Sequence, residues 1–194
     1  MIKRSYYIVN GITLYRLIAA PVLVVLILTG NVGIFKWLLP VSFFTDMVDG
    51  YLARKYKVIS VMGTKLDSLA DDLTVVAAIV GLFVLKPWFI REEITWISIL
   101  FSLFLAQTIL ALVKYHKLSG FHTYSAKVSA LLQGIFLIFI FLLPEPIYPL
   151  FYVAAISTSI DLIEEIILIF ILPKWEADVK GLYWVLKRKN KRKK

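Results

Sequence analysis

The sequence has 194 residues, of which 60% are hydrophobic and 18% charged, and its mean hydropathy is +0.81. This composition has too little polar surface to cover a water-soluble globular protein, so it indicates a membrane protein. Cysteine is absent, which excludes disulfides and thiolate metal sites, and any metal is therefore expected to have oxygen ligands.

Six apolar segments of membrane-spanning length follow one another along the chain, and each is predicted to form a transmembrane helix. In chain order they are Ile8–Gly30, Val32–Arg54, Gly63–Leu85, Ile94–Lys114, Ser125–Leu143 and Ile147–Leu172. The connections are short, so neighbouring helices should run antiparallel. Several segments carry polar residues on one face, as helices around a shared cavity do. The predicted fold class is all-α, a polytopic six-transmembrane-helix bundle that forms one domain over residues 1–174.

The distribution of lysine and arginine predicts the orientation of these helices. An even number of spans places both termini on one side, and that side holds all of the 22 basic residues except Lys36, Lys86 and Arg91. The positive-inside rule makes this side cytoplasmic. The first residues have no cleavable-signal pattern, so we expect them to be retained.

Residues 175–194 are predicted to form a cytoplasmic interfacial and polybasic tail. Trp175, Tyr183 and Trp184 are typical of the membrane interface, and the last eight residues contain seven lysines and arginines. Such a segment attracts anionic lipid. Nucleic-acid binding is the alternative, but no folded nucleic-acid-binding domain accompanies the basic run, so we expect a lipid bilayer and no nucleic acid as partner.

Four aspartates occur at spacings that place them on shared helix faces. Asp46 and Asp49 are three residues apart, and Asp67 and Asp71 are four apart. The short connection between the second and third segments returns the third helix beside the second. Both pairs are therefore expected to converge near the cytoplasmic face. Four carboxylates this close cannot all stay ionised without compensating positive charge.

Divalent metal ions are predicted to supply that charge. All-oxygen coordination favours hard ions such as Mg²⁺, with Mn²⁺ or Ca²⁺ as alternatives, and four carboxylates suit two ions that clamp a phosphoryl group. Gly50 and Gly63 permit close approach of a ligand, Ala53 leaves room for a flat base, and Arg54 suits a phosphate. The alternative is a buried ion-pair network of the aspartates with Arg54 and Lys65.

The motif that contains these residues resembles the signature of the CDP-alcohol phosphotransferases, also called CDP-alcohol phosphatidyltransferases. Its fixed positions are all filled by Asp46-x-x-Asp49-Gly50-x-x-Ala53-Arg54, eight further residues, and Gly63-x-x-x-Asp67-x-x-x-Asp71. Asn10-x-x-Thr13-x-x-Arg16, followed by Pro21, is similar to the opening of many bacterial members. The size and apolar character look most like the bacterial branch that uses CDP-diacylglycerol.

This resemblance implies a homodimeric enzyme of the bacterial cytoplasmic membrane that transfers a phosphatidyl group from CDP-diacylglycerol to a small alcohol and releases CMP. It implies two Mg²⁺ (or Mn²⁺) ions bound by Asp46, Asp49, Asp67 and Asp71. Asp71 would also act as the base for the acceptor hydroxyl. The residues implied around the CDP moiety are Gly50, Ala53, Arg54 and Gly63.

The acceptor alcohol is less closely specified by the resemblance. Phosphatidylglycerophosphate synthase is the best single interpretation, and phosphatidylserine or phosphatidylinositol(-phosphate) synthase is the alternative. Asp67-Ser68-Leu69-Ala70-Asp71 is closer to bacterial phosphatidylserine synthases, and Ala106-Gln107-Thr108 stands where glycerophosphate-using relatives often carry an Arg-Glu pair. Lys127 is the candidate to bind a phosphorylated acceptor, although a lysine there can also extend to the membrane interface.

Asp161, Glu164 and Glu165 share one face of the last segment and are expected to form interhelical hydrogen bonds, with acceptor or dimer contacts as the alternative. A cation- or proton-coupled transporter is the interpretation from a different functional class. It predicts an inverted repeat, and the sequence has one acidic motif without a second copy.

Overall fold

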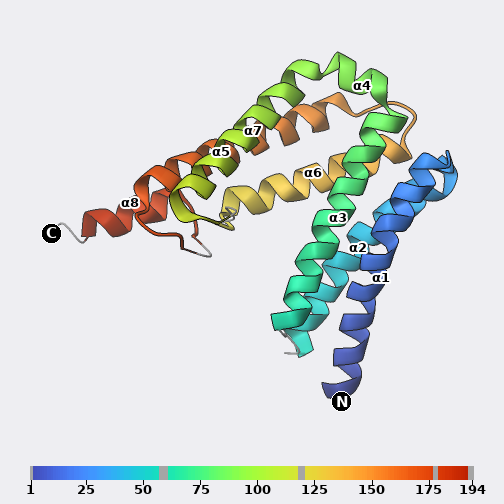
Figure 1. Ribbon diagram of the computed structural model, residues 1–194, viewed down its shortest axis with the longest axis horizontal. Coiled ribbons are helices and arrows are strands. Elements are labelled where there is room, and N and C mark those ends of the chain that lie inside the picture. The colour runs from blue at the N-terminus through green and yellow to red at the C-terminus, as the bar shows by residue number, and fades with distance from the viewer. Residues whose placement is uncertain (1, 57–60, 118–120, 177–178, 192–194) are drawn as a thin grey trace. The chain divides into compact units, whose positions relative to one another are not determined.

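The computed structural model describes residues 2–56, 61–117, 121–176 and 179–191, and these residues form helices and no strand. The helices, labelled in Figure 1, are α1 (Ile2–Leu28), α2 (Val32–Tyr56), α3 (Val61–Leu85), α4 (Pro87–Glu92), α5 (Ile94–Tyr115), α6 (Tyr124–Leu142), α7 (Tyr148–Ile171) and α8 (Leu182–Lys191). The all-α prediction is confirmed.

Each of the six apolar segments overlaps with one long helix, and α1 begins six residues before the predicted start at Ile8. The turn between α1 and α2 is stabilised by local interactions. Gly30 has a φ of +72°, which costs glycine little, and the N–H of Asn31 donates to the carbonyl of Leu26 at 2.9 Å. Short α4 and α8 were not among the predicted spans.

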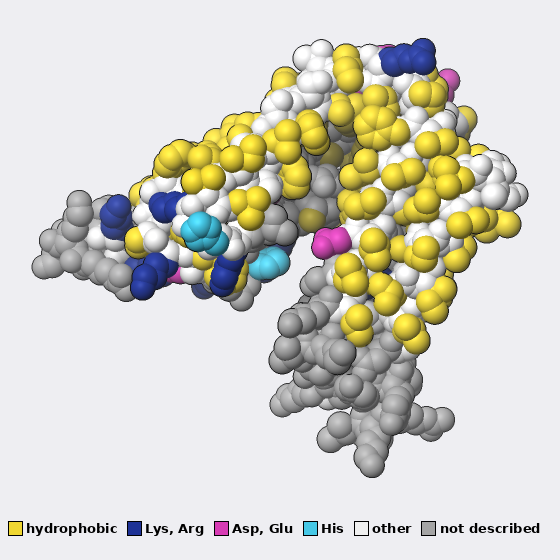
Figure 2. Space-filling view, viewed as in Figure 1, with side chains coloured by type: hydrophobic (Ala, Val, Ile, Leu, Met, Phe, Trp, Pro, Cys, Tyr) yellow, Lys and Arg dark blue, Asp and Glu magenta, His cyan; other side chains and the backbone are white. Residues whose placement is uncertain are grey.

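Three of the described helices are suited by length and composition to cross a membrane, at Gly11–Leu28, Ile94–Tyr115 and Tyr124–Leu142. Large apolar side chains stay exposed on them, such as Ile18 at 57%, Val113 at 73% and Leu131 at 63%. Figure 2 shows hydrophobic side chains over much of the visible surface of the helices. These features support an integral membrane protein, because lipid covers such surfaces. The six-span arrangement and the cytoplasmic position of the site stay predictions.

The chain divides into two compact units, of which the first comprises residues 1–92. In this unit α1 packs on both α2 and α3. Small buried side chains occur on both partners of the α1–α3 contact, and they are Ala19, Ala20, Ala70, Ala77 and Ala78. Small residues permit close approach of helix backbones. The α1–α3 contact therefore holds the polar residues of both helices near one another.

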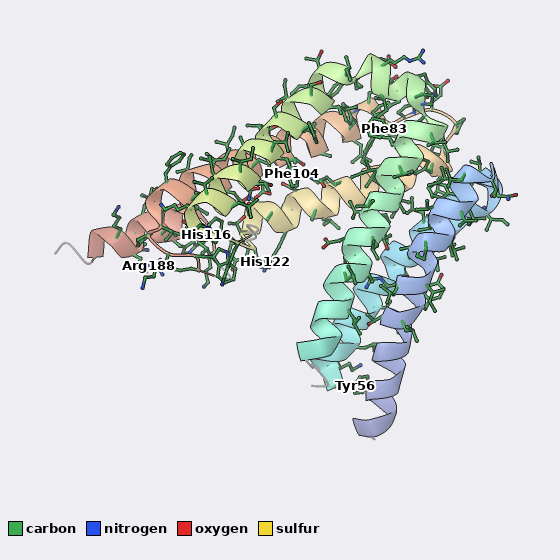
Figure 3. The ribbon with its side chains drawn as sticks, in the orientation of Figure 1. Tyr56, Phe83, Phe104, His116, His122 and Arg188 are labelled. Carbon is green, nitrogen blue, oxygen red and sulfur yellow. The ribbon has the colours of Figure 1, made fainter. Side chains whose placement is uncertain are left out.

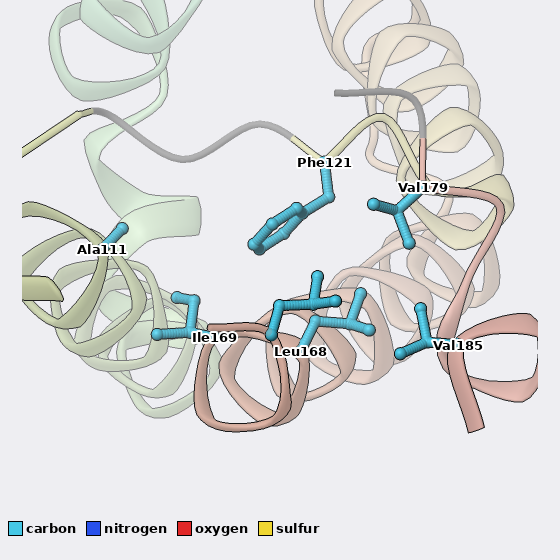
Figure 4. Packing of buried hydrophobic residues seen from close by; sticks show 7 residues of the cluster. Ala111, Phe121, Leu168, Ile169, Val179 and Val185 are labelled. Atoms are coloured by element: carbon cyan, nitrogen blue, oxygen red, sulfur yellow. The ribbon is translucent and has the colours of Figure 1, made fainter. Parts of the chain in front are cut away.

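The second unit comprises residues 93–194, and α7 lies at its centre. This helix packs against α5, α6 and α8. Figure 4 shows a buried apolar cluster that joins α5, the segment before α6, α7 and the segment around α8, made of Ala111, Phe121, Leu168, Ile169, Leu172, Val179 and Val185. The expectation of a single domain over residues 1–174, followed by an interfacial tail, stays a prediction.

Candidate functional site

Three helices of the first unit bring one arginine and three aspartates together. Arg16 of α1 places Nη1 2.8 Å from Oδ1 of Asp46 on α2 and 2.8 Å from Oδ1 of Asp67 on α3. Its Nη2 contacts Oδ1 of Asp71. Asp67 and Asp71 are one turn apart on α3, so they present their carboxylates on the same face. The guanidinium thus bridges all three carboxylates.

The cluster combines a buried cation with partly hydrated anions. The side chain of Arg16 is 1% exposed, whereas those of Asp46, Asp67 and Asp71 are 40%, 34% and 41% exposed. A guanidinium at this depth requires paired acceptors, which the aspartates provide. Three carboxylates and one guanidinium still leave two negative charges in this group. The exposed side of the cluster can therefore attract a divalent cation.

The same aspartates fit a hard metal ion by geometry and by donor type. Asp46, Asp67 and Asp71 each offer one carboxylate oxygen such that the three atoms lie within 4.8 Å of one another. Oxygen ligands of one octahedral Mg²⁺ stand about 2.1 Å from the ion and at most about 4.2 Å apart. Small side-chain rotations close that difference. The structure thus brings together three of the four predicted metal ligands, and their role as ligands stays a prediction.

The other predicted site residues lie in the same two helices. Asp49, Gly50, Ala53 and Arg54 belong to α2, and Gly63 belongs to α3. Their side-chain positions are outside the described part of the structure. The predicted alternative, an ion-pair network of the aspartates with Arg54 and Lys65, likewise falls on side chains outside it.

Among the described residues of the site, Arg16 was not predicted from the sequence to lie with the aspartates. The signal was present, because a single arginine inside an otherwise apolar segment is costly unless it has a partner. Thr13 lies one turn earlier on α1 and is also buried, at 5% exposed. Spacing alone shows that these two residues share a face of α1, but it does not show which helix that face meets.

Lys127 lies in the second unit, on the first turn of α6. Thr123 caps the start of this helix, since its Oγ1 accepts a hydrogen bond of 3.1 Å from the N–H of Ala126. The side chain of Lys127 is exposed, and its Nζ stands 5.8 Å from the centre of the Tyr124 ring. An exposed ammonium at a helix start can bind an anion, and the substrate role of Lys127 stays a prediction.

A second polar cluster connects α7 with α5, α6 and α8. Asp161 Oδ1 accepts from Thr123 Oγ1 at 3.2 Å and from Ser125 Oγ at 3.0 Å. Ser125 also contacts Oε2 of Glu164. The buried Glu165 accepts at Oε2 from Gln107 Nε2 of α5, at 2.5 Å. These contacts are the interhelical hydrogen bonds expected for the three acids.

His116 and His122 bracket the connection between α5 and α6, as Figure 3 shows. Both residues have positive φ, 55° and 52°, and both side chains are exposed. The N–H of His116 donates to the carbonyl of Leu112 at 3.0 Å, so it ends α5 in a left-handed cap.

Comparisons with known proteins agree with the acidic motif. A stretch of 93 residues is 38% identical to a CDP-diacylglycerol–glycerol-3-phosphate 3-phosphatidyltransferase of Cereibacter sphaeroides, covering 44% of this chain and 42% of that protein. A stretch of 62 residues is 40% identical to a cardiolipin synthase (CMP-forming) / mitochondrial hydrolase fusion protein of Schizosaccharomyces pombe, covering 32% of this chain and 10% of that protein. The aligned parts are less than half of either relative.

No solved structure matches this chain. The sequence profile of the CDP-alcohol phosphatidyltransferases matches residues 6–171, which include Arg16 and all four motif aspartates. This match covers most of the chain and confirms both the resemblance and the enzyme class predicted from the motif. The chain belongs to the CDP-alcohol phosphatidyltransferase family.

Proposed function

We propose that this protein is an integral-membrane phospholipid synthase that transfers a phosphatidyl group from CDP-diacylglycerol to an alcohol and releases CMP. The observation that carries the proposal is the convergence of Asp46, Asp67 and Asp71 in a chain of this family. Their oxygens match the ligand preference of Mg²⁺ or Mn²⁺. With Asp49 as the fourth ligand, the site would hold two ions.

The chemistry assigns separate roles to the residues of the site. Metal ions held by the four aspartates would neutralise the pyrophosphate and stabilise CMP as leaving group. Asp71 accepts the proton of the acceptor hydroxyl, whose oxygen forms a new bond to the phosphatidyl phosphorus. The bond from that phosphorus to the bridging oxygen breaks, and CMP leaves with this oxygen and the electron pair. The proposed CDP contacts are Gly50, Ala53, Arg54 and Gly63.

Glycerol 3-phosphate is the preferred acceptor in this proposal, which makes the protein a phosphatidylglycerophosphate synthase. The name of the Cereibacter relative supports this choice over serine, inositol or inositol phosphate. Gln107 is neutral, and its buried amide already donates to Glu165, so it offers no positive charge to a phosphorylated acceptor. Lys127, exposed on the first turn of α6, is the proposed phosphate-binding residue.

The proposal places the protein in a bacterial cytoplasmic membrane, as a homodimer with six spans and both termini cytoplasmic. The three apolar helices and the exposed apolar side chains support membrane insertion. Charged residues interrupt α2, α3 and α7, as the three acids on α7 illustrate. Polar groups that face the bundle interior permit such helices to span as well. The active site would then lie near the cytoplasmic face.

The purified protein should release CMP from CDP-diacylglycerol only when Mg²⁺ or Mn²⁺ and a suitable alcohol are present. Glycerol 3-phosphate, serine, inositol phosphate and inositol are supplied in separate reactions, and CMP is measured by chromatography. We expect glycerol 3-phosphate to give the highest rate. Equal release in excess chelator would disprove the metal-dependent mechanism. Absence of release with every acceptor, together with metal- or proton-dependent ion flux in vesicles, would favour the transporter.

Substitution of Lys127 should separate the two substrates. Lys127→Ala removes the charge that pairs with a phosphorylated acceptor, so the acceptor KM should rise about tenfold or more while the donor KM stays nearly unchanged. Lys117→Ala is the matched control, because Lys117 is also exposed and its Nζ lies 4.7 Å from the centre of the Trp175 ring. An unchanged acceptor KM in the Lys127 variant would leave this lysine with an interfacial role only.

A further inference from the structure

We propose that α8 forms a docking surface for anionic lipid headgroups and is held in a fixed position at the start of α6. The surface consists of exposed aromatic, apolar and basic side chains: Tyr183, Trp184, Leu186, Lys187, Arg188 and Lys189. The inference rests on the proposed function for the membrane location of the chain. It goes further by naming the residues of α8 that meet the lipid and a structural connection to the helix that carries Lys127.

The exposed residues of α8 combine the two features that interfacial helices use. Tyr183, Trp184 and Leu186 are 64%, 45% and 44% exposed, whereas Val185 on the other side of α8 is buried. Lys187, Arg188 and Lys189 follow directly and are exposed as well, and the guanidinium of Arg188 is paired with the carboxylate of Glu176 at 2.8 Å. Aromatic rings prefer the headgroup region, and clustered lysine and arginine attract anionic lipid.

The other side of α8 is anchored to the bundle. Val185 is 5% exposed and belongs to the apolar cluster with Phe121 and Leu168, as Figure 4 shows. The N–H of Leu182 donates to Oε1 of Glu164 at 2.6 Å. The helix is therefore attached at its first turn, and the exposed residues cannot turn inward without breaking these contacts.

Gly181 is required for this attachment. Its φ is +142°, and a Cβ at this position would lie 2.9 Å from Oε1 of Glu164, the atom that accepts from Leu182. Any other residue would be strained in this conformation and would push the carboxylate away. The chain therefore uses a glycine where α8 meets the acid of α7.

The same contacts connect α8 to the start of α6. The carbonyl of Lys180 accepts a hydrogen bond from the N–H of Tyr124 at 3.3 Å, and the centres of the Tyr124 and Trp184 rings are 5.4 Å apart. Ser125 contacts the other oxygen of Glu164. Lys127 is on this first turn of α6, so a lipid bound at α8 would stabilise the turn that carries the proposed acceptor-binding lysine.

Charge and composition favour an anionic lipid surface over a nucleic acid as the occupant. Helix α7 ends at Ile171, α8 begins at Leu182, and α8 packs on α7. Because α7 also packs on the apolar helices α5 and α6, α8 stays close to the membrane. A free nucleic acid would not require the exposed Leu186, whereas an interface buries it.

A single fluorophore on α8 tests the proposal. The chain has no cysteine, so Leu186→Cys provides a unique site for an environment-sensitive dye. The labelled full chain is reconstituted in vesicles of phosphatidylcholine, with or without phosphatidylglycerol. We expect brighter, blue-shifted emission with phosphatidylglycerol and reversal of this change by salt. Glu145→Cys, labelled at an exposed site beyond the end of α6, is the control and should not respond to lipid charge.

Charge variants determine which residues produce the response. The triple change Lys187→Gln, Arg188→Gln and Lys189→Gln should weaken docking about fivefold for each lysine removed, and by less for Arg188, which is already paired with Glu176. The matched control neutralises Lys36, Lys86 and Arg91 and should keep the full response. Equal loss in both triple variants, or no dependence on phosphatidylglycerol, would overturn the proposal. An equal emission change on adding single-stranded DNA to phosphatidylcholine vesicles would also overturn it, in favour of nucleic-acid binding.

CMP release measured on the same samples separates this inference from the proposed function. If the dye does not respond while CMP release is normal, the docking surface is disproved and the catalytic proposal is unaffected. If the dye responds while CMP is never released, the catalytic proposal fails and the lipid contact of α8 is supported.

Discussion

The Asp71→Asn variant is expected to fold, to bind CDP-diacylglycerol in a metal-dependent manner, and to turn over more slowly by a factor on the order of 10² or more. Asparagine keeps the size of aspartate and one carbonyl oxygen for the metal, but it cannot accept the proton of the acceptor hydroxyl. The measurements are kcat from CMP release and the affinity for CDP-diacylglycerol with and without Mg²⁺.

Asp46→Asn and Asp67→Asn are the matched comparisons for Asp71→Asn. Their carboxylates converge on the same arginine, yet neither is assigned a proton in the mechanism. They should weaken metal-dependent binding of the donor rather than act on kcat alone. Near-normal turnover of the Asp71 variant would show that Asp71 is not the base, even if all three variants bind metal more weakly.

Removal of Arg16 should lower the stability of the metal-free protein and increase the stabilisation that metal provides. Arg16→Met leaves three carboxylates without their bridging cation, so the chelator-treated protein should lose about 3 kcal/mol of stability. This value is at the low end for a broken buried ion pair, because the aspartates are partly hydrated. Mg²⁺ then becomes the main remaining compensation, and it should raise the melting temperature more in the variant than in the unaltered protein.

The controls for Arg16 test charge and geometry separately. Arg91→Met removes an exposed arginine of α4 in the same unit and should change neither the melting temperature nor the Mg²⁺ response. Arg16→Lys keeps the charge but cannot contact three carboxylates with one planar group. Its melting temperature and its Mg²⁺ response should therefore lie between those of Arg16→Met and those of the unaltered protein. An equal Mg²⁺-induced shift in the Arg16→Met variant and the unaltered protein would show that arginine and metal do not share the carboxylates.

The helices and the family could be predicted from the sequence, because both depend on short stretches of residues. Apolar segments of spanning length predicted the long helices, because helix formation depends on residues within a turn or two of one another. The spacing of Asp67 and Asp71 placed both on one face of α3 for the same reason. The signature between Asp46 and Asp71 indicated the family, which the match over residues 6–171 confirmed.

The contacts between residues far apart in the sequence could not be predicted in this way. Arg16 contacts Asp67 across 51 residues of sequence, Gln107 contacts Glu165 across 58, and the N–H of Leu182 reaches Glu164 across 18. Each pairing depends on how far one helix is rotated and displaced against its neighbour. That placement is determined by packing of buried side chains such as Ala20 and Leu168, and short-range spacing carries no information about it.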